Sequence, residues 1–165
     1  MPKQHYRADT FHLRDSIGYL VKRSQRLMQA RIEGVFEQRG CTLQQWVVLM
    51  LVRDRLALTV ADLCRETGHD SGAMTRLIDQ LEARKLIERR RNPQDRRVIE
   101  LSLTELGNET VEALIVIATD SLNTVMQDFT HDEVKLFKSM LRRLIGRLED
   151  LAPHSAAAAS AEQTS

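Results

Sequence analysis

The 165-residue sequence contains few aromatic residues, few glycines and only two cysteines. Aromatic side chains make up 4% of the chain, beside seven glycines and three prolines. Cys41 and Cys64 form no C-x-x-C pair, which excludes a disulfide framework. The scattered glycines match neither G-x-G-x-x-G nor G-x-x-x-x-G-K-S/T, so the sequence predicts no phosphate-binding loop.

Long hydrophobic runs are also missing. The longest, Trp46–Val52, has seven residues, whereas a membrane-spanning helix needs about 20. The first residues, Met1–Arg7, lead into no apolar segment, which predicts no secretory signal. A hydrophobic content of 42% is nevertheless too high for a disordered chain. We therefore expect a soluble, cytoplasmic protein that makes no membrane contact.

The charges nearly cancel but are unevenly distributed. There are 24 basic and 23 acidic residues, which gives a net charge of +1. Residues 1–97 contain 19 basic and 12 acidic side chains, whereas residues 98–165 contain five basic and 11 acidic ones. A basic part joined to an acidic part indicates one region that binds a polyanion and another with a different role.

Apolar residues recur at helical spacing through most of the chain, which predicts a mainly α-helical protein. The outer parts of the pattern predict amphipathic helices over residues 11–39, 104–127 and 130–151. Thr130 and Glu133 form a capping box at the start of the last helix.

Helix and buried strand compete as interpretations of Trp46–Val52. Thr42 and Gln45 form a capping box directly before this run and favour a buried helix. Thr59 and Asp62 repeat the pattern and open a shorter helix.

Two short helices with a tight turn between them follow, which predicts a helix-turn-helix. The first ends at Gly68, and Asp70 or Ser71 can cap the second. The second helix has inward positions at i, i+3, i+4 and i+7 spacing: Met74, Leu77, Ile78 and Leu81.

A β-hairpin is predicted directly behind this pair of helices. Residues 86–91 are extended in character, and Asn92–Asp95 fits a type I turn. A half-buried strand follows, with alternating apolar residues Ile99, Leu101 and Leu103. A helix-turn-helix with a basic hairpin behind it is a winged helix-turn-helix with a small β-hairpin wing.

The segment Arg84–Arg97 carries seven basic and two acidic side chains, a net charge of +5. On its own it would be interpreted as a solvated charged hairpin, but beside a helix-turn-helix it favours DNA binding. Near the start of the second helix, Ser71, Thr75 and Arg76 lie where side chains reach base edges in a major groove, although capping or a plain surface role also fits the first two. The candidate backbone or minor-groove contacts from the hairpin are Arg89, Arg91, Arg96 and Arg97.

The stretch from about residue 42 to 107 resembles the multiple-antibiotic-resistance regulator (MarR) family of winged-helix transcription factors. The motifs that carry the resemblance are Met74–Glu82, Leu86–Arg89, the wing residues Asp95-Arg96-Arg97 and Leu103–Gly107. With the flanking helices, the resemblance covers about 140 residues.

The resemblance implies a homodimer that binds a pseudo-palindromic DNA operator. It also implies that Asp95 braces Arg97 and leaves Arg96 freer to contact DNA, although the two arginines can exchange roles. The terminal helices support dimerisation independently, because their apolar surface is larger than one small winged helix could cover. Two-fold symmetry places the half-sites roughly 34–36 Å apart.

These inferences divide the chain into five parts. We expect a flexible arm at 1–9, an N-terminal dimerisation helix at 10–40 and a winged-helix DNA-binding domain at 41–103. The C-terminal dimerisation helices then occupy 104–151, and 152–165 forms a disordered tail that is rich in alanine and serine.

The resemblance further implies regulation by a small ligand, commonly an aromatic acid or phenol. Arg14 can pair with a carboxylate, and Tyr19 can donate its hydroxyl or stack on a ring. The full set of candidate ligand residues is His12, Arg14, Ser16, Tyr19 and Trp46. The competing interpretation makes these residues surface charges, interface residues and plain core.

Oxidation of Cys41 is an alternative trigger, because this cysteine precedes a helix N-terminus that could lower its pKa. The histidines are scattered and pair with no cysteine at ligand spacing, so we expect no metal and no cofactor. No motif of an enzyme is present. The sequence therefore predicts a sequence-specific DNA-binding regulator, in the first place a repressor released by an aromatic ligand. The competing class is a winged helix that binds only proteins.

Overall fold

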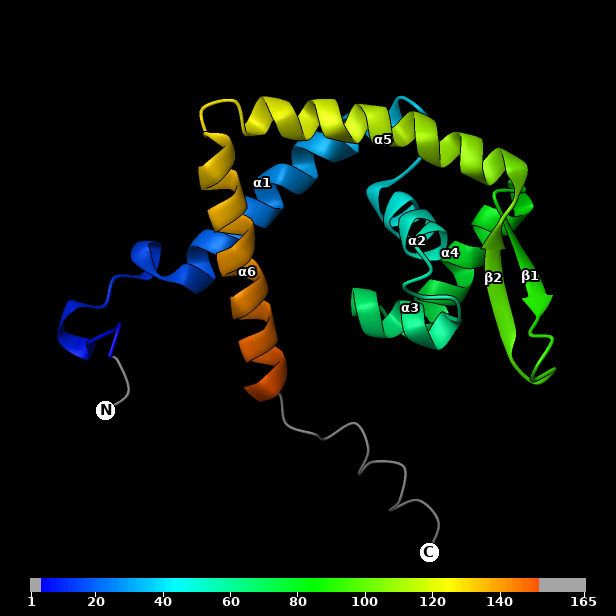
Figure 1. Ribbon diagram of the computed structural model, residues 1–165, viewed down its shortest axis with the longest axis horizontal. Helices are drawn as coiled ribbons and strands as arrows, with labels where there is room; N and C mark the ends of the chain where they lie inside the picture. The colour runs from blue at the N-terminus through cyan, green and yellow to red at the C-terminus, as the bar shows by residue number, and fades with distance from the viewer. Residues whose placement is uncertain (1–3, 152–165) are drawn as a thin grey trace, which may run out of the picture. The chain divides into compact units, whose positions relative to one another are not determined.

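The structure is a computed structural model that describes residues 4–151 (Figure 1). The predicted tail at 152–165 therefore lies outside the described residues. The chain divides between Ser121 and Leu122 into two compact units. The first contains the helices α1 (Ile17–Glu37), α2 (Leu43–Arg53), α3 (Val60–Thr67) and α4 (Ser71–Ala83), and the strands β1 (Ile87–Arg91) and β2 (Ile99–Leu103). Helix α5 (Glu105–Val125) begins in the first unit and crosses into the second, where α6 (His131–Leu151) follows.

The predicted helix caps are confirmed. Thr42 with Gln45 and Thr59 with Asp62 each form a complete capping box, in which the side chain of each residue accepts from the backbone N–H of the other. The first box settles the competition over residues 46–52 in favour of a helix. The side chain of Asp70 caps α4 by accepting from the N–H of Ala73 at 2.9 Å.

The first helix begins later than its apolar pattern predicts. Instead of starting at residue 11, α1 starts at Ile17, after short 3-10 helices at Ala8–Thr10 and Leu13–Asp15. The physical reason is Ser16, whose backbone is extended and whose hydroxyl accepts from the N–H of Tyr19. A serine in this role ends the preceding segment and nucleates the helix.

The segment before α1 is not a featureless arm within the described residues. The hydroxyl of Tyr6 accepts a hydrogen bond from the N–H of Ile17 at 3.0 Å. Its ring also meets the ring of Phe11 edge-on, at a centroid distance of 6.0 Å. In the described part of the arm predicted for residues 1–9, Tyr6 thus contacts the start of α1.

The core of the first unit consists of two hydrophobic clusters. The larger one joins α2, α3, α4, the hairpin and the first half of α5: Val48, Leu49, Val52, Ala57, Leu63, Met74, Ile78, Leu81, Leu86, Ile87, Leu101 and Val111. The smaller one joins the end of α1 to α5: Phe36, Cys41, Leu114 and Ala118. Because α5 contributes to both clusters, it connects the winged helix to α1.

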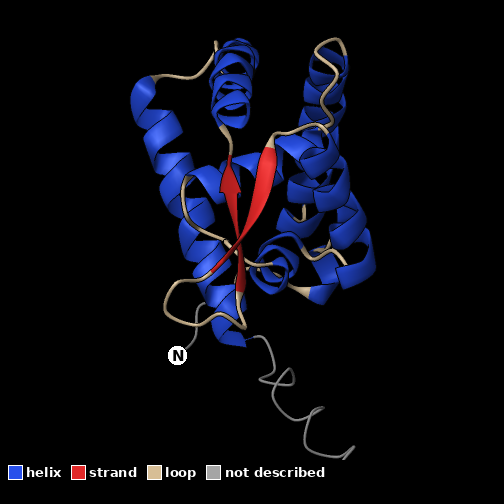
Figure 2. Ribbon diagram, turned by 90° about the vertical axis from the view of Figure 1, so that its right-hand side faces the viewer, coloured by secondary structure: helices blue, strands red, loops and turns tan. Residues whose placement is uncertain are grey.

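The hairpin is antiparallel, with Ile87 opposite Leu103 and Arg91 opposite Ile99 (Figure 2). Its inward face is shorter than expected, because Leu101 is buried while Ile99, on the same face, is 52% exposed. Only the base of the hairpin overlies the core.

The connection between the strands is longer than the predicted type I turn at Asn92–Asp95. The side-chain oxygen of Asn92 accepts from the N–H groups of Gln94 and Asp95. The backbone hydrogen bond of a turn closes three residues later, where Val98 N–H donates to Asp95 O at 3.0 Å. The asparagine side chain thus replaces the backbone acceptor that the simple turn would have used.

The second unit consists of the end of α5 and helix α6. The predicted capping box is confirmed: Glu133 N–H donates to the hydroxyl of Thr130, whose own N–H donates to the Glu133 carboxylate. No residue of α6 is buried. Large apolar side chains that are more than half exposed recur along it: Leu136, Phe137, Met140, Ile145, Leu148 and Leu151. None of the helices in residues 4–151 is long and apolar enough to cross a membrane.

Candidate nucleic-acid interface

Helix α4 presents one apolar and one polar face. Met74, Ile78 and Leu81 are buried in the larger cluster, whereas Ser71, Thr75 and Arg76 are exposed. The hydroxyl of Thr75 donates to the carbonyl of Ser71 at 2.7 Å, which fixes its rotamer. The start of α4 thus offers a hydroxyl, a methyl and a guanidinium side by side to a partner outside the chain.

The turn before α4 is short because Gly68 adopts a left-handed conformation, with φ of +73°. The N–H of Ala73 holds the pKa of the Asp70 carboxyl below its ordinary value. The carboxylate is therefore ionised at neutral pH and occupies the N-terminus of α4, where it satisfies free N–H groups.

Arg89, one of the residues predicted to contact DNA, connects the wing to α4 in this structure. Its guanidinium donates to Asp79 Oδ1 at 2.5 Å and to the carboxylate of Glu82, both on α4. The hydrogen bond to Asp79 raises the pKa of Arg89, and the negative charge of Glu82 adds to this effect. Both partners lie on α4, and the Arg89 side chain is only 29% exposed. Arg89 therefore links β1 to α4.

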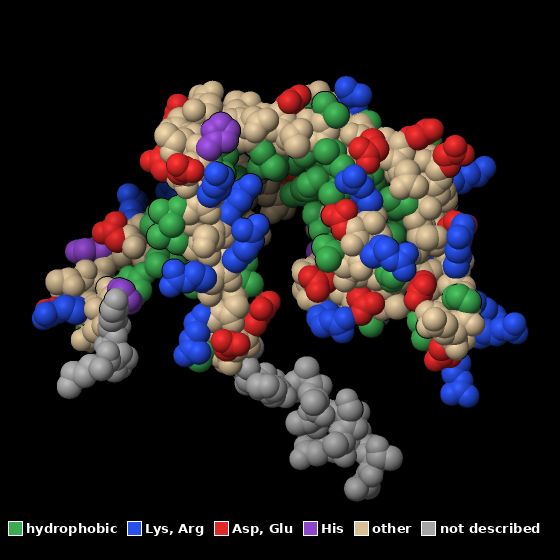
Figure 3. Space-filling model, in the orientation of Figure 1, with side chains coloured by type: hydrophobic (Ala, Val, Ile, Leu, Met, Phe, Trp, Pro, Cys, Tyr) green, Lys and Arg blue, Asp and Glu red, His purple; other side chains and the backbone are tan. Residues whose placement is uncertain are grey.

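The remaining predicted wing arginines lie at the far end of the hairpin. Arg91, Arg96 and Arg97 are exposed, and in the described part of the chain none of them forms an ion pair. Arg90, in contrast, pairs with Glu88 on its own strand. Lys and Arg side chains project at this end of the molecule in the space-filling view (Figure 3). Because these charges are uncompensated, they attract a polyanion.

Asp95 shapes the wing tip through the backbone. Its Oδ1 accepts from the N–H of Arg97 at 3.0 Å, while its own N–H donates to Asn92 Oδ1. Asn92 in turn donates to Glu100 Oε1 on β2 at 2.6 Å. Asp95 therefore contacts the main chain of Arg97, which leaves both Arg96 and Arg97 side chains exposed.

The five residues predicted to bind a ligand are not brought together. His12 and Arg14 are exposed in the segment before α1, and Ser16 is the cap of that helix. Tyr19 accepts a hydrogen bond from Arg23 at 3.1 Å on the surface of α1. Trp46 packs against Phe36 in the smaller cluster, at a ring-centroid distance of 5.2 Å.

A hollow of about 340 Å³ lies instead between α1, α2 and the helix-turn-helix. Gln25 and Gln29 line it from α1, and the floor is apolar: Leu43, Val47, Val48, Met74 and Leu77. His69, in the turn before α4, also lines the hollow, and its Nδ1 is buried without a hydrogen-bond partner in the described structure. Sequence reasoning missed His69, because a lone histidine in a turn carries no signal.

Cys41 is a core residue. Its side chain is 2% exposed and packs in the smaller cluster. Burial raises the pKa of the Cys41 thiol, and the nearby Arg84 offsets this only in part. Because the thiolate is the reactive form of cysteine, this environment disfavours oxidation at Cys41.

The fold and the basic face together define a winged-helix DNA-binding protein. The sequence profile of the MarR family matches residues 39–98. The regulator SarZ of Staphylococcus epidermidis is 31% identical over 101 residues, which cover 60% of this chain and 68% of SarZ. The chain belongs to the MarR family.

Three further comparisons extend over most of the chain. The transcriptional repressor NicR of Pseudomonas putida is 26% identical and covers 82% of this chain and 85% of its own. The organic hydroperoxide resistance regulator of Bacillus subtilis is 28% identical, with coverages of 85% and 94%. The solved structure of BpsR from Bordetella bronchiseptica, whose DNA binding is regulated by 6-hydroxynicotinic acid, is 26% identical with a TM-score of 0.71 and coverages of 81% and 96%. This chain is thus a DNA-binding transcriptional regulator of the MarR type.

Proposed function

We propose that the protein acts as a homodimeric repressor on a pseudo-palindromic operator. In this proposal Ser71, Thr75 and Arg76 of α4 contact bases in the major groove, and the wing arginines lie along the backbone or in the adjacent minor groove. One observation carries it: the exposed polar start of α4 and the unpaired arginines of the wing tip belong to the same compact unit. The similar protein NicR is a transcriptional repressor by name, which supports repression and not activation in this proposal.

Arg89 has a different role in this proposal from the one its charge indicates. Since Asp79 and Glu82 already occupy its guanidinium, we assign it to holding the wing against α4 and not to a phosphate. Arg76 contacts a base, whereas Arg91, Arg96 and Arg97 contact the backbone or the minor groove.

Fluorescence anisotropy at about 150 mM salt tests the proposal directly. DNA from upstream of the protein's own gene is compared with a scrambled duplex of equal length, and we expect a preference on the order of 10³-fold. Arg76→Ala should relax discrimination among operator variants, and Arg96→Ala should lower both affinity and the salt dependence. Equal, weak binding to both duplexes would leave only an electrostatic footprint, and no binding at all would favour the protein-interaction class.

We further propose that the hollow between α1, α2 and the helix-turn-helix binds the effector, a small aromatic acid or phenol. Its apolar floor suits a ring, and the unpaired Nδ1 of His69 suits a polar substituent. The BpsR ligand, 6-hydroxynicotinic acid, belongs to this chemical class. A ligand here would touch Met74, Leu77 and the turn before α4, so it can shift the start of the recognition helix and, by linkage, weaken DNA binding.

The effector proposal is tested with 6-hydroxynicotinic acid, benzoate and 4-hydroxybenzoate as probes. We expect at least one to release the wild-type protein from its operator, with a shift of roughly 5- to 150-fold in affinity. His69→Ala should keep operator affinity and lose most of this response. His131→Ala, at an exposed histidine at the start of α6 that does not line the hollow, is the matched control. If His69→Ala leaves the response unchanged, the ligand binds at a site other than this hollow.

A further inference from the structure

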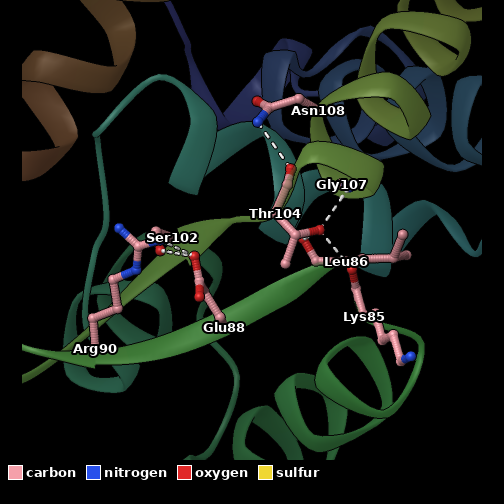
Figure 4. A network of polar contacts seen from close by, with 8 residues as sticks. All are labelled: Lys85, Leu86, Glu88, Arg90, Ser102, Thr104, Gly107 and Asn108. Atoms are coloured by element: carbon pink, nitrogen blue, oxygen red, sulfur yellow. Dashed lines mark hydrogen bonds and ion pairs between the residues drawn. The ribbon is translucent and has the colours of Figure 1, made fainter.

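The base of the wing, the end of α4 and the start of α5 meet at one side chain, Thr104. Its hydroxyl donates to the carbonyl of Lys85 at 2.5 Å and lies 3.5 Å from that of Leu86 (Figure 4). The same oxygen accepts from the N–H of Gly107 at 3.0 Å. One hydroxyl therefore bridges the connection between α4 and β1 and the first turn of α5.

The main chain around Thr104 reinforces this joint. The N–H of Thr104 donates to Leu86 O at 3.1 Å, and the side chain of Asn108 donates to Thr104 O at 2.9 Å. Gly107 lies so close to the Leu86 carbonyl that an added Cβ would fall far inside van der Waals contact. The first turn of α5 and the base of the wing are therefore in direct backbone contact.

The rest of the wing is tied to α4 and to itself. Arg89 fastens β1 to α4, and the bonds of the tip run among Asn92, Asp95 and Glu100 within the hairpin. Leu101 N–H adds one bond to Leu58 O in the loop after α2, at 2.7 Å. The wing is therefore held to α4 and to the loop after α2, and it meets α5 at the Thr104 joint and through Val111 in the larger cluster.

Helix α5 continues from this joint into the smaller cluster. Leu114 and Ala118 pack there against Phe36 of α1 and Cys41. Any tilt of α5 imposed from that cluster reaches Gly107 and Thr104 through a continuous, hydrogen-bonded helix.

We infer that Thr104 is a positioning residue for DNA binding, which makes the wing follow the orientation of α5. The inference rests on the proposed function, since it assigns the wing arginines to DNA. Without the hydroxyl, the wing keeps its charges, but its angle to α5 is held only by the bond from Thr104 N–H to Leu86 O and by the Gly107 packing, and is therefore less narrowly fixed. The arginines then spend less time at the backbone, and affinity and salt dependence fall together.

The test is a double-mutant cycle measured by operator anisotropy over a range of salt concentrations. Thr104→Val removes the hydroxyl at nearly constant volume, and Thr104→Ser, which keeps it, is the matched control. Each is combined with the pair Arg96→Ala and Arg97→Ala, and all variants are measured well below their melting temperatures. We expect Thr104→Val to weaken binding roughly five- to tenfold, the scale of one hydrogen bond. Thr104→Ser should stay within about twofold, and the salt slope should drop only in the valine variant.

The decisive comparison is the background without wing arginines. If Thr104 acts through the wing, Thr104→Val has no further effect there. An equal loss in both backgrounds would overturn the inference, as would failure of both Thr104→Val and the smaller Thr104→Ala to fold, since the joint would then serve folding alone. Absence of operator binding by the wild type would instead refute the proposed function.

Discussion

Gly107 has no room for a side chain. A Cβ there would collide with the carbonyl of Leu86, which is a backbone atom and cannot turn away. Gly34, in the last turn of α1, has nothing within 4 Å of the same position. Substitution by alanine should therefore change the stability of the protein in opposite directions at the two glycines.

Gly107→Ala should destabilise the protein by about 3 kcal/mol, because α5 must move away from the wing to admit the methyl group. Gly34→Ala should raise the unfolding free energy by up to about 1 kcal/mol, since alanine is the better helix former. Urea unfolding of both variants measures the difference. An unchanged midpoint for Gly107→Ala would contradict the close approach.

Asp95 is a second residue whose role depends on a backbone contact. Asp95→Ala removes a negative charge beside two arginines, which alone would strengthen DNA binding. We expect binding to weaken about fivefold instead, because Arg97 N–H loses its acceptor and the tip loses its shape. Asp95→Asn keeps an oxygen acceptor and should stay near wild type. Tighter operator binding by Asp95→Ala would refute this role.

Capping carboxylates make the helix-turn-helix sensitive to acid. Backbone N–H groups hold the Asp70 pKa below its ordinary value of 3.8, and the Thr59 hydroxyl does the same for Asp62. A depressed pKa in the folded state means that the stabilisation is complete above about pH 4 and disappears as pH falls through the folded value.

Asp70→Asn should remove part of this acid sensitivity, because an amide can accept the same bond and does not titrate. Thermal unfolding at pH 7 should be nearly unchanged, while below about pH 4 the melting temperature should fall less than in the wild type. Parallel curves for the two proteins would show that the cap contributes nothing to acid unfolding.

Features determined by neighbours in the sequence could be predicted, and those that depend on distant contacts could not. The capping boxes at Thr42 and Thr59 need only residues three positions apart, so the helices that they open were predictable. The ion pairs of Arg89 could not be predicted, because its partners Asp79 and Glu82 come close only once β1 lies on α4. The hollow beside His69 was missed for the same reason, since four separate segments line it.

At the scale of the whole molecule, α6 stands out because it carries large apolar side chains and none of its residues is buried. Leu148 is 59% exposed and Phe137 51%. Such a row of side chains forms a larger apolar patch than monomeric proteins usually expose. We propose that a second copy of the chain buries it in the homodimer.

We expect the protein to sediment as a dimer at micromolar concentration. Phe137→Glu and Leu148→Glu should each shift it toward monomer, because a carboxylate would be buried without a partner. Lys135→Glu, on the polar side of α6, should leave the dimer intact. Sedimentation velocity distinguishes the three variants, and a dimer that survives both apolar substitutions would place the interface elsewhere.

The unbroken run of α5 sets a mechanical scale for regulation. Gly107 and Ala118, which both belong to the first unit, lie roughly 16 Å apart along this helix at 1.5 Å per residue. A rotation of about 5° around Gly107 would therefore move Ala118 by roughly 1.4 Å. In the proposed mechanism, a shift of this size in the smaller cluster would turn the wing by a few degrees. The distance between the two residues would then set how strongly a change in packing alters the angle at which the wing meets DNA.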